Sequence, residues 1–321
     1  MNKKGKIAVI APAESLKKVS ENRIFAQSRI EKELNMKVIY GKSSMKAGLL
    51  NSASIKERVT DLHSAFLNND VEIILCAKGG YNSNELLEYI DWDIIKNNSK
   101  PIIGLSDITV LLNAIYAKTK IITYLGPTFI DFAEKKGFEY SLEYFKKALF
   151  LKEFSIEQSN EWTNDSFFRN QDNKTYIKNE GPLILQKGKA VGRIVGGNLC
   201  SLNLLQGTNY MPPLKDHILF IEDDDLAGES FFGEFNRNLT SLLQTKDAKK
   251  IKALIIGRNQ PTSHMDIIKS KYAFLTKMLS KSIPIIIDVD FGHTTPRITL
   301  PIGGTAEITA TSTTAKIVIK K

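Results

Sequence analysis

Apolar and polar positions follow two different rhythms along the first 150 residues, and the two rhythms take turns. Short apolar runs, such as KIAVIAPA (6–13) and VEIILCAKGG (71–80), are typical of strands buried on both faces. Longer stretches with apolar residues three or four apart, such as SIKERVTDLHSAFLNN (54–69), are typical of amphipathic helices. Because strands and helices alternate, we predict a parallel sheet covered by helices on both sides.

The predicted elements of this first region, residues 1–150, are five strands and five helices. The strands cover 6–13, 37–41, 71–80, 100–106 and 120–127, and the helices cover 21–35, 54–69, 83–90, 107–120 and 139–150. Ser52 or Ser54 is suited to cap the helix that begins near residue 54, because a serine oxygen can accept a free N–H of the first turn.

The rhythm breaks at residues 151–189, where Asn, Asp and Ser are frequent. We interpret this segment as a linker and long loop, of the kind that often forms a binding lid. Its aromatic residues either contact a ligand or pin the loop to the body of the protein; they are Trp162, Phe167 and Phe168.

A second region, 190–321, returns to alternating strands and helices. We predict a strand, a Gly-Gly turn and a helix over 188–208, strands at 217–225, 252–258 and 283–294, and helices at 235–251 and 266–279. The tail, 297–320, is predicted to be a β-hairpin or ribbon.

The composition is that of a globular protein of about two domains. The 321 residues carry a formal charge of +9, with lysines scattered along the chain, which favours a solvated basic surface; an anionic substrate is compatible with it. No nucleic-acid-binding motif is present. No stretch approaches the roughly 20 apolar residues that span a bilayer, and two cysteines give no disulfide framework. We expect a cytoplasmic protein that binds neither nucleic acid nor membrane.

Four strand ends carry unusual residues, and ligands of open α/β sheets bind at the carboxyl ends of strands. Ser106 lies where an apolar strand meets a helix, so it is either a helix cap or a nucleophile. Gly79 and Gly80 end another strand, either as a plain tight turn or as a source of N–H groups for an oxyanion.

The other two strand ends carry acids and a histidine. The run IEDDD begins with Glu222 and suits a solvated acidic loop, a cation site, or one carboxylate that orients a histidine. His293 follows a strand and precedes a Thr-Thr-Pro turn, whereas His63, His217 and His264 lie elsewhere. A serine needs a base, the base needs a carboxylate, and backbone donors must face the oxyanion, so together the four strand ends favour catalysis.

These motifs, in this order, resemble the LD-carboxypeptidase family of serine peptidases, and within it the microcin C immunity (MccF-like) branch. The segments that carry the resemblance cover nearly the whole chain: IAVIAPA, KGGYNSNELLEYIDWD, KPIIGLSDITVLLNAIY, GRIVGGNL, ILFIEDDD and DVDFGHTTPRITLPIGG. The resemblance implies a flavodoxin-like N-terminal domain and a smaller β-rich α/β C-terminal domain, with the active site in the cleft between them.

The resemblance also implies roles for individual residues. Ser106, Glu222 and His293 form the triad, and backbone N–H groups of Asp107 and of the Gly79-Gly80 turn form the oxyanion hole. Such proteins use no metal or other cofactor and are commonly homodimers. Candidate substrate contacts are Lys78, where relatives often carry Arg or an aliphatic residue, Tyr81, and one of the loop aromatics (Trp162, Phe167 or Phe168), which stacks on a nucleotide base in the immunity branch.

The expected activity is therefore that of a serine carboxypeptidase acting on a small peptide or an aminoacyl nucleotide. The long insert favours the immunity branch, whose members cleave the amide between an aminoacyl group and a nucleotide-like moiety. A murein tetrapeptide LD-carboxypeptidase, which removes the terminal D-alanine, is the alternative with the same triad. A non-catalytic small-molecule binding protein is the alternative from another class.

Overall fold

The first sheet of the molecule has the strand order of a flavodoxin-like fold. The computed structural model describes residues 5–165, 171–260, 279–280 and 282–321. Strands β2, β1, β3, β4 and β5 are parallel neighbours in that order, and β14 adds an antiparallel edge beside β5. Their bounds are Lys37–Tyr40, Lys6–Ile10, Val71–Cys76, Ile102–Gly104, Thr123–Leu125 and Leu300–Ile302.

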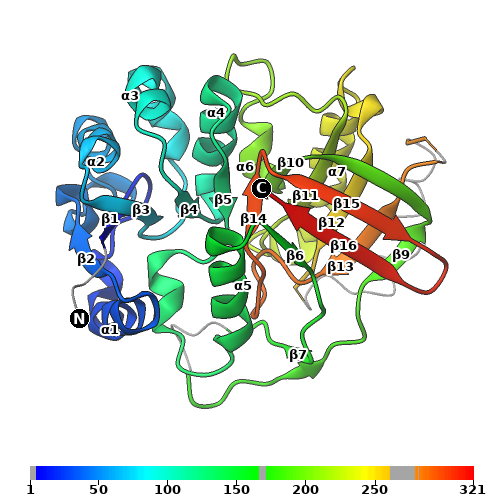
Figure 1. Ribbon diagram of the computed structural model, residues 1–321, viewed down its shortest axis with the longest axis horizontal. Helices are drawn as coiled ribbons and strands as arrows, with labels where there is room; N and C mark the ends of the chain where they lie inside the picture. The colour runs from blue at the N-terminus through cyan, green and yellow to red at the C-terminus, as the bar shows by residue number, and fades with distance from the viewer. Residues whose placement is uncertain (1–4, 166–170, 261–278, 281) are drawn as a thin grey trace.

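Helices cover both faces of this sheet, as the alternating pattern predicts. Helices α2, α3 and α4 lie above it in Figure 1, and α1 and α5 lie below it. They span Arg23–Leu34 (α1), Ile55–Leu67 (α2), Trp92–Asn97 (α3), Thr109–Thr119 (α4) and Glu139–Phe150 (α5). Ser54 is the cap of α2, since it accepts the N–H of Glu57 while the Glu57 carboxylate accepts the N–H of Ser54.

One predicted helix of the first region is a 3-10 helix in the structure. The helix predicted at 83–90 is η4 (Ser83–Tyr89), and α3 begins three residues after its end, at Trp92. Asp91 separates the two, because its carboxylate accepts the N–H groups of Asp93 and Ile94 and so starts a new helix.

The second sheet has eight strands, in the order β6, β16, β15, β10, β11, β12, β13, β9. Strands β10 to β13 are parallel to one another, and the strands on either side are antiparallel. In sheet order the bounds are Glu153–Ser155, Ala315–Lys320, Thr305–Ala310, Gly188–Asn198, His217–Glu222, Ala253–Gly257, Ile285–Val289 and Leu183–Gln186. Helices α6 (Leu199–Asn203) and α7 (Phe231–Leu243) follow β10 and β11. The predicted pairing of an α/β N-terminal domain with a β-rich C-terminal domain is confirmed.

Two details differ from prediction, one in the tail of the second region and one in the segment 151–189. The hairpin at the end of the chain is β15 and β16, but β14 of the same tail joins the first sheet, so the tail ties the two sheets together. The segment 151–189 is not a bare loop: it contains β6, β9 and a small two-stranded ribbon of β7 (Glu161–Trp162) and β8 (Ile177–Lys178). The helix predicted at 266–279 lies almost wholly outside the described residues.

The predicted Gly-Gly turn is wrong, because Gly196 and Gly197 lie inside β10. Both have φ values that L side chains rarely adopt, +127° and +128°. A Cβ on Gly197 would lie 2.6 Å from Thr109 Oγ1, so the glycine lets β10 approach the N-terminus of α4 closely.

The close approach is held by hydrogen bonds between the two regions. Asn113 of α4 donates to Gly196 O at 2.8 Å and accepts its N–H at 3.2 Å, while Thr109 Oγ1 accepts the N–H of Asn198 at 2.9 Å. The helix that follows Ser106 is therefore fixed against the second sheet.

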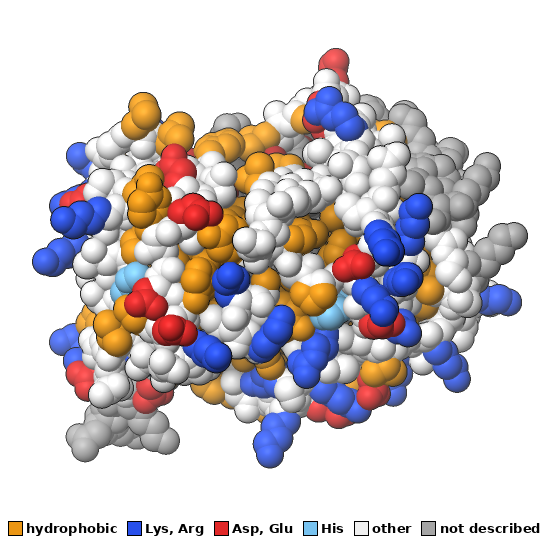
Figure 2. Space-filling model, turned by 90° about the horizontal axis from the view of Figure 1, so that it is seen from above, with side chains coloured by type: hydrophobic (Ala, Val, Ile, Leu, Met, Phe, Trp, Pro, Cys, Tyr) orange, Lys and Arg blue, Asp and Glu red, His pale blue; other side chains and the backbone are white. Residues whose placement is uncertain are grey.

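The surface agrees with the scattered basic charge of the sequence. On the face in Figure 2, Lys and Arg side chains are interspersed with Asp and Glu rather than gathered in one patch. Within the described residues, no helix is long and apolar enough to cross a membrane.

Candidate active site

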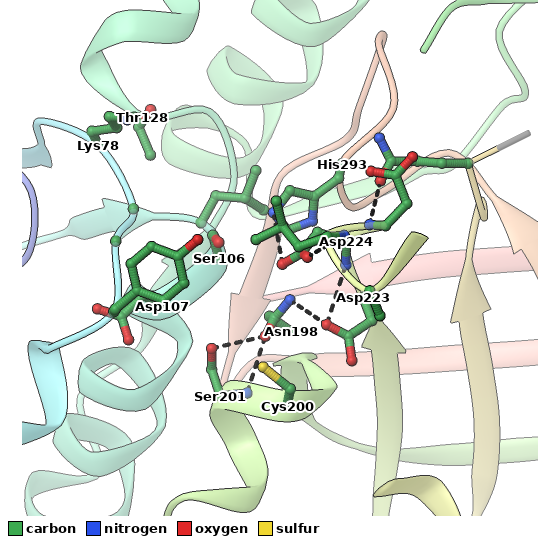
Figure 3. Close-up of a pocket in the computed structure, with 18 of the residues that line it drawn as sticks. Lys78, Ser106, Asp107, Thr128, Asn198, Cys200, Ser201, Asp223, Asp224 and His293 are labelled. Carbon is green, nitrogen blue, oxygen red and sulfur yellow. Dashed lines mark hydrogen bonds and ion pairs between the residues drawn. The ribbon is translucent and has the colours of Figure 1, made fainter. Parts of the chain in front are cut away.

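The carboxyl ends of the parallel strands in both sheets border one cavity of about 690 Å³. In the first sheet, β3 and β4 lead into it, and in the second sheet β10, β11 and β13 do the same. Figure 3 shows Ser106 on the side of the first sheet, with His293, Asp223 and Asp224 on the side of the second. The structure thus brings together strand ends that lie up to 213 residues apart along the chain, from Cys76 to Val289, as the position rule for α/β sheets predicts.

Ser106 occupies a strained turn just after β4. Its φ is +63°, which is uncommon for a residue other than glycine and is a conformation that functional sites retain. The helical cap position is Leu105, which makes no side-chain cap, so the interpretation of Ser106 as a cap is wrong. The turn has the form of a nucleophile elbow, in which a serine between a strand and a helix projects its hydroxyl into a cavity.

His293 borders the same cavity from the second sheet, and a buried carboxylate supports it from behind. Glu222, the last residue of β11, is 1% exposed, and its Oε2 lies 2.6 Å from His293 Nδ1. This contact assigns the proton on the ring to Nδ1 and leaves Nε2 for the cavity. Gly292 makes room for the pair, because a Cβ there would lie 2.7 Å from Glu222 Oε2.

The surroundings of His293 favour its cation. Burial lowers the pKa of His293, but Glu222 and Asp224 outweigh that effect and raise the pKa to about 9. Asp224 Oδ2 lies 4.0 Å from His293 Nε2, on the edge of the ring that Glu222 does not occupy. The imidazole is accordingly a stronger base than an ordinary histidine.

The glycine motif lies directly beside the serine. A Cβ on Gly79 would be 2.8 Å from Ser106 Cβ, so only glycine permits this approach. Gly79 O accepts the N–H of Glu14 at 3.1 Å, and the Glu14 carboxylate pairs with Lys78 at 2.7 Å. Lys78, Gly79, Gly80 and Asp107 all border the cavity, as does Tyr81, whose side chain is largely exposed.

The predicted loop aromatics have different outcomes. Trp162 is half-buried in β7 and lies over the Arg258 guanidinium, 5.1 Å from the ring centroid; it is absent from the lining of the cavity, which the neighbouring Thr163, Asn164 and Asp165 reach. Phe167 and Phe168 fall outside the described residues.

The acidic run after β11 is more structured than a solvated loop. Asp223 is buried and accepts the amide of Asn198 at 2.8 Å, and burial, together with Glu222 and Asp224, raises the pKa of Asp223 to about 7. In the described part of the chain, no group of three or more His, Cys, Asp and Glu side chains is arranged to hold a metal ion.

Sequence reasoning missed two members of the site. Asn198 ends β10 and caps α6 through Ser201, and it holds Asp223 with its amide (Figure 3). Asp224 faces His293. Asn198 is the last residue of β10 and Asp224 lies two residues after the end of β11, so the same strand-end rule that selected Glu222 applies to them. The remaining described histidines lie elsewhere: His63 accepts the N–H of Asp91, and His217 contacts the Tyr116 hydroxyl.

Comparison with known proteins assigns the chain to a family. Two family models match the chain, the LD-carboxypeptidase N-terminal domain over residues 7–126 and the LD-carboxypeptidase C-terminal domain over residues 191–308. The chain belongs to the LD-carboxypeptidase family. The resemblance noted in its motifs is therefore confirmed.

Several relatives cover nearly the whole chain. A putative carboxypeptidase, YocD of Bacillus subtilis, is 43% identical over 99% of this chain and 98% of its own length. The microcin C7 self-immunity protein MccF of Escherichia coli is 33% identical over 88% of this chain and 84% of its own length. The murein tetrapeptide carboxypeptidase of Pseudomonas aeruginosa is 26% identical, with 79% and 78% covered.

Solved structures share the fold. An MccF-like protein from Bacillus anthracis superposes with a TM-score of 0.96 at 43% identity, over 100% of this chain and 98% of that one. MccF in complex with glutamyl sulfamoyl guanosine superposes with a TM-score of 0.85 at 30% identity, over 100% and 97%. The predicted MccF-like two-domain fold is thereby confirmed.

Proposed function

We propose that this protein is a serine carboxypeptidase in which Ser106, Glu222 and His293 form the catalytic triad. The observation that carries the proposal is that His293, whose Nδ1 lies 2.6 Å from Glu222 Oε2, borders the same cavity as the left-handed turn at Ser106. Each part comes from a separate strand end, and a purely structural role for one of them does not account for the other two. Membership of a carboxypeptidase family supports a peptidase.

In the proposed reaction, Ser106 Oγ attacks the carbonyl carbon of the scissile amide while His293 Nε2 takes the hydroxyl proton. The charge on the carbonyl oxygen is balanced by N–H groups of Asp107 and of the Gly79-Gly80 turn. His293 returns the proton to the leaving nitrogen as the carbon–nitrogen bond breaks. Water, deprotonated by the same imidazole, then releases the acyl group from Ser106.

Two groups tune this chemistry. Glu222 holds His293 in one tautomer and stabilises the imidazolium that forms at each transfer. Because the pKa of His293 is about 9, the neutral base becomes more abundant as pH rises toward that value. Activity is therefore expected to increase from neutral to mildly alkaline pH.

The substrate that we propose is an aminoacyl nucleotide or a short peptide analogue of it. The support is the match to MccF, which has been solved with aminoacyl sulfamoyl nucleosides. The cavity of about 690 Å³ is large enough for a ligand of this kind. A murein tetrapeptide is the alternative, favoured by relatives that act on murein peptides.

The test is a parallel screen of wild type and Ser106→Ala. Glutamyl sulfamoyl adenosine and an LD-linked murein tetrapeptide are incubated with each protein, and products are identified by mass spectrometry. We expect wild type to hydrolyse the nucleoside substrate and Ser106→Ala to lose at least roughly a thousandfold in kcat. Full activity of the alanine variant contradicts the triad, and cleavage of the murein peptide alone contradicts the immunity-type substrate.

A fluorophosphonate probe separates an enzyme from a binding protein. We expect covalent labelling of Ser106 in wild type and none in Ser106→Ala. Absence of labelling together with retained ligand affinity supports a non-catalytic binding protein instead.

We further propose that the protein is a cytoplasmic homodimer, on the basis of the family resemblance. Light scattering coupled to size-exclusion chromatography gives the mass directly. A single species near the 36.0 kDa of one chain contradicts the dimer.

A further inference from the structure

The side chain of Asp107 is buried and is hydrogen-bonded to the loop after β3. This loop carries Gly79 and Gly80 and is called the glycine loop below. Asp107 is 3% exposed, and its Oδ2 accepts the N–H of Asn82 at 3.0 Å and the N–H of Ser83 at 2.8 Å. In return, Ser83 Oγ donates to Asp107 O at 2.7 Å. Three hydrogen bonds therefore join the turn after β4, which carries Ser106, to the loop after β3, which carries Gly79 and Gly80.

Asp107 takes the part of a capping side chain at the start of η4, although it comes from a different strand end. Asn82 is the cap residue of η4, and its side chain makes no cap hydrogen bond. The acceptor for the free N–H groups of η4 comes instead from the neighbouring strand, by way of Asp107. A serine or aspartate at position 82 would satisfy η4 alone, whereas the acceptor at 107 also fixes where η4 begins relative to Ser106.

A buried cation holds the same loop from its other side. Arg58 of α2 is 2% exposed, and its Nη1 donates to Asn82 O and to Pro12 O, each at 2.9 Å. The N–H of Asn82 is thus bound by one buried charged side chain and its C=O by another. Both peptide planes around Asn82 are fixed, and Tyr81 is the one residue between Asn82 and the Gly79-Gly80 turn.

Burying a carboxylate costs free energy unless hydrogen bonds and nearby opposite charge compensate for the water it loses. Burial raises the pKa of Asp107 above its usual value, and the N–H groups of Ser83 and Asn82 offset only part of that rise. Hydrogen bonds to an anion are shorter and stronger than neutral ones and keep their donors in a narrower range of positions.

We propose that the Asp107 side chain is a positioning residue, which orients the glycine loop against Ser106 so that the N–H groups of the two turns converge on one carbonyl oxygen. The inference rests on the proposed serine mechanism and adds to it the device that sets the oxyanion hole. Displacement by about 1 Å is enough to cost roughly a hundredfold in rate, which is why a rigid link between the two turns matters.

The test compares Asp107→Ala with Asp107→Asn. The asparagine keeps a carbonyl oxygen that can accept both N–H groups, and the alanine keeps none. We expect Asp107→Ala to lower kcat about a hundredfold with KM changed by less than about threefold, and Asp107→Asn to recover at least about a tenth of wild-type kcat. The rate of Ser106 labelling by the fluorophosphonate is expected to fall in parallel, because the phosphonyl oxygen occupies the same hole.

Asp61 provides a matched control for lost stability. It is also a buried aspartate that accepts a backbone N–H and a hydroxyl, both from Ser43, and it does not border the cavity. Asp61→Ala is expected to lower the melting temperature as Asp107→Ala does and to leave kcat and the labelling rate unchanged. Should Asp107→Ala fail to fold, Ser83→Ala removes one hydrogen bond of the link and is expected to lower kcat several-fold.

The outcomes separate this inference from the proposed function. Wild type that is neither active nor labelled contradicts the serine mechanism itself. Active, labelled wild type with Asp107→Ala equal to it in kcat and labelling rate contradicts the positioning role. A rise in KM with unchanged kcat, or an asparagine variant no better than the alanine, also overturns it.

Discussion

Replacing Asp224 by asparagine is expected to lower the pKa of His293. Asp224 Oδ2 lies 4.0 Å from His293 Nε2, and its other oxygen accepts the N–H of Leu226 at 3.1 Å. Asparagine has the same shape and can keep the second contact through its carbonyl oxygen. The substitution therefore removes a charge next to the imidazole with little change in packing.

The size of the shift follows from the distance. Two unit charges 4 Å apart interact by about 1 kcal/mol in water and by about 4 kcal/mol at an effective dielectric constant of about 20. Since one pKa unit equals about 1.4 kcal/mol, these limits correspond to shifts of about 0.8 and about 3 units. The side chains of His293 and Asp224 are 19% and 20% exposed, so water screens the pair and we expect about one unit, from about 9 to about 8.

Other charges around His293 stay in place in this variant. Glu222 continues to raise the pKa of His293, and Arg297 continues to lower it. Asp223 titrates in the same range, with a pKa of about 7 that Asp224 helps to raise, so its own pKa falls in the variant. A measurement on the imidazole itself is therefore needed.

Histidine-specific NMR provides that measurement without any substrate. Protein labelled at its four histidines is titrated, and the His293 resonance is assigned by its loss in His293→Gln. Asp225→Asn is the control, because Asp225 borders the same cavity whereas the carboxylates that act on His293 are Glu222 and Asp224. The acid limb of kcat/KM should move with the resonance. Identical titration of His293 in wild type and Asp224→Asn would refute the reasoning.

Three further predictions concern the stability of the folded protein. Gly197→Ala is expected to destabilise the protein by about 2–4 kcal/mol in urea unfolding, because its Cβ meets Thr109 at 2.6 Å and its φ of +128° is strained; unchanged stability contradicts the close approach. Lys174→Met removes the ion-pair partner of the buried Glu134 carboxylate and should cost about 3–5 kcal/mol in the same urea unfolding; an unchanged free energy of unfolding contradicts it. The pKa of His293 is raised from 6.5 to about 9 by folding, so its contribution of about 3 kcal/mol is complete below pH 6.5 and disappears as pH rises through 9; a difference from His293→Gln that grows with pH contradicts this.

The strand ends show how far local pattern reaches toward a site. Ser106, Glu222 and His293 each follow an apolar run; in the structure Ser106 and His293 border one cavity, and Glu222 lies behind His293 in contact with its Nδ1. The strand-end rule worked because parallel strands bring their carboxyl ends to one edge, whatever lies between them in the chain. Asn198 and Asp224 also lie at the carboxyl ends of parallel strands. However, an asparagine, or one more aspartate in an acidic run, does not by residue type indicate a role in a site.

Other features depend on contacts that no local pattern contains. Gly196 and Gly197 form a turn by composition, yet they lie within β10 because α4 approaches them from the other region. Trp162 was a candidate for substrate stacking, and it lies over Arg258. In both cases the deciding partner is far away in the chain, so the residue type alone supports more than one environment.

The sequence by itself determined the layers, the strand and helix rhythm, the family and the strand ends that carry chemistry, since these depend on periodicity and residue type over short windows. Tertiary structure alone decided that Ser106 has a left-handed backbone, that Asp107 joins two loops, and that Asp224 lies beside the ring nitrogen opposite Glu222. Backbone strain, burial and the electrostatic environment of His293 are sums over neighbours from several elements. They exist only once the chain has packed.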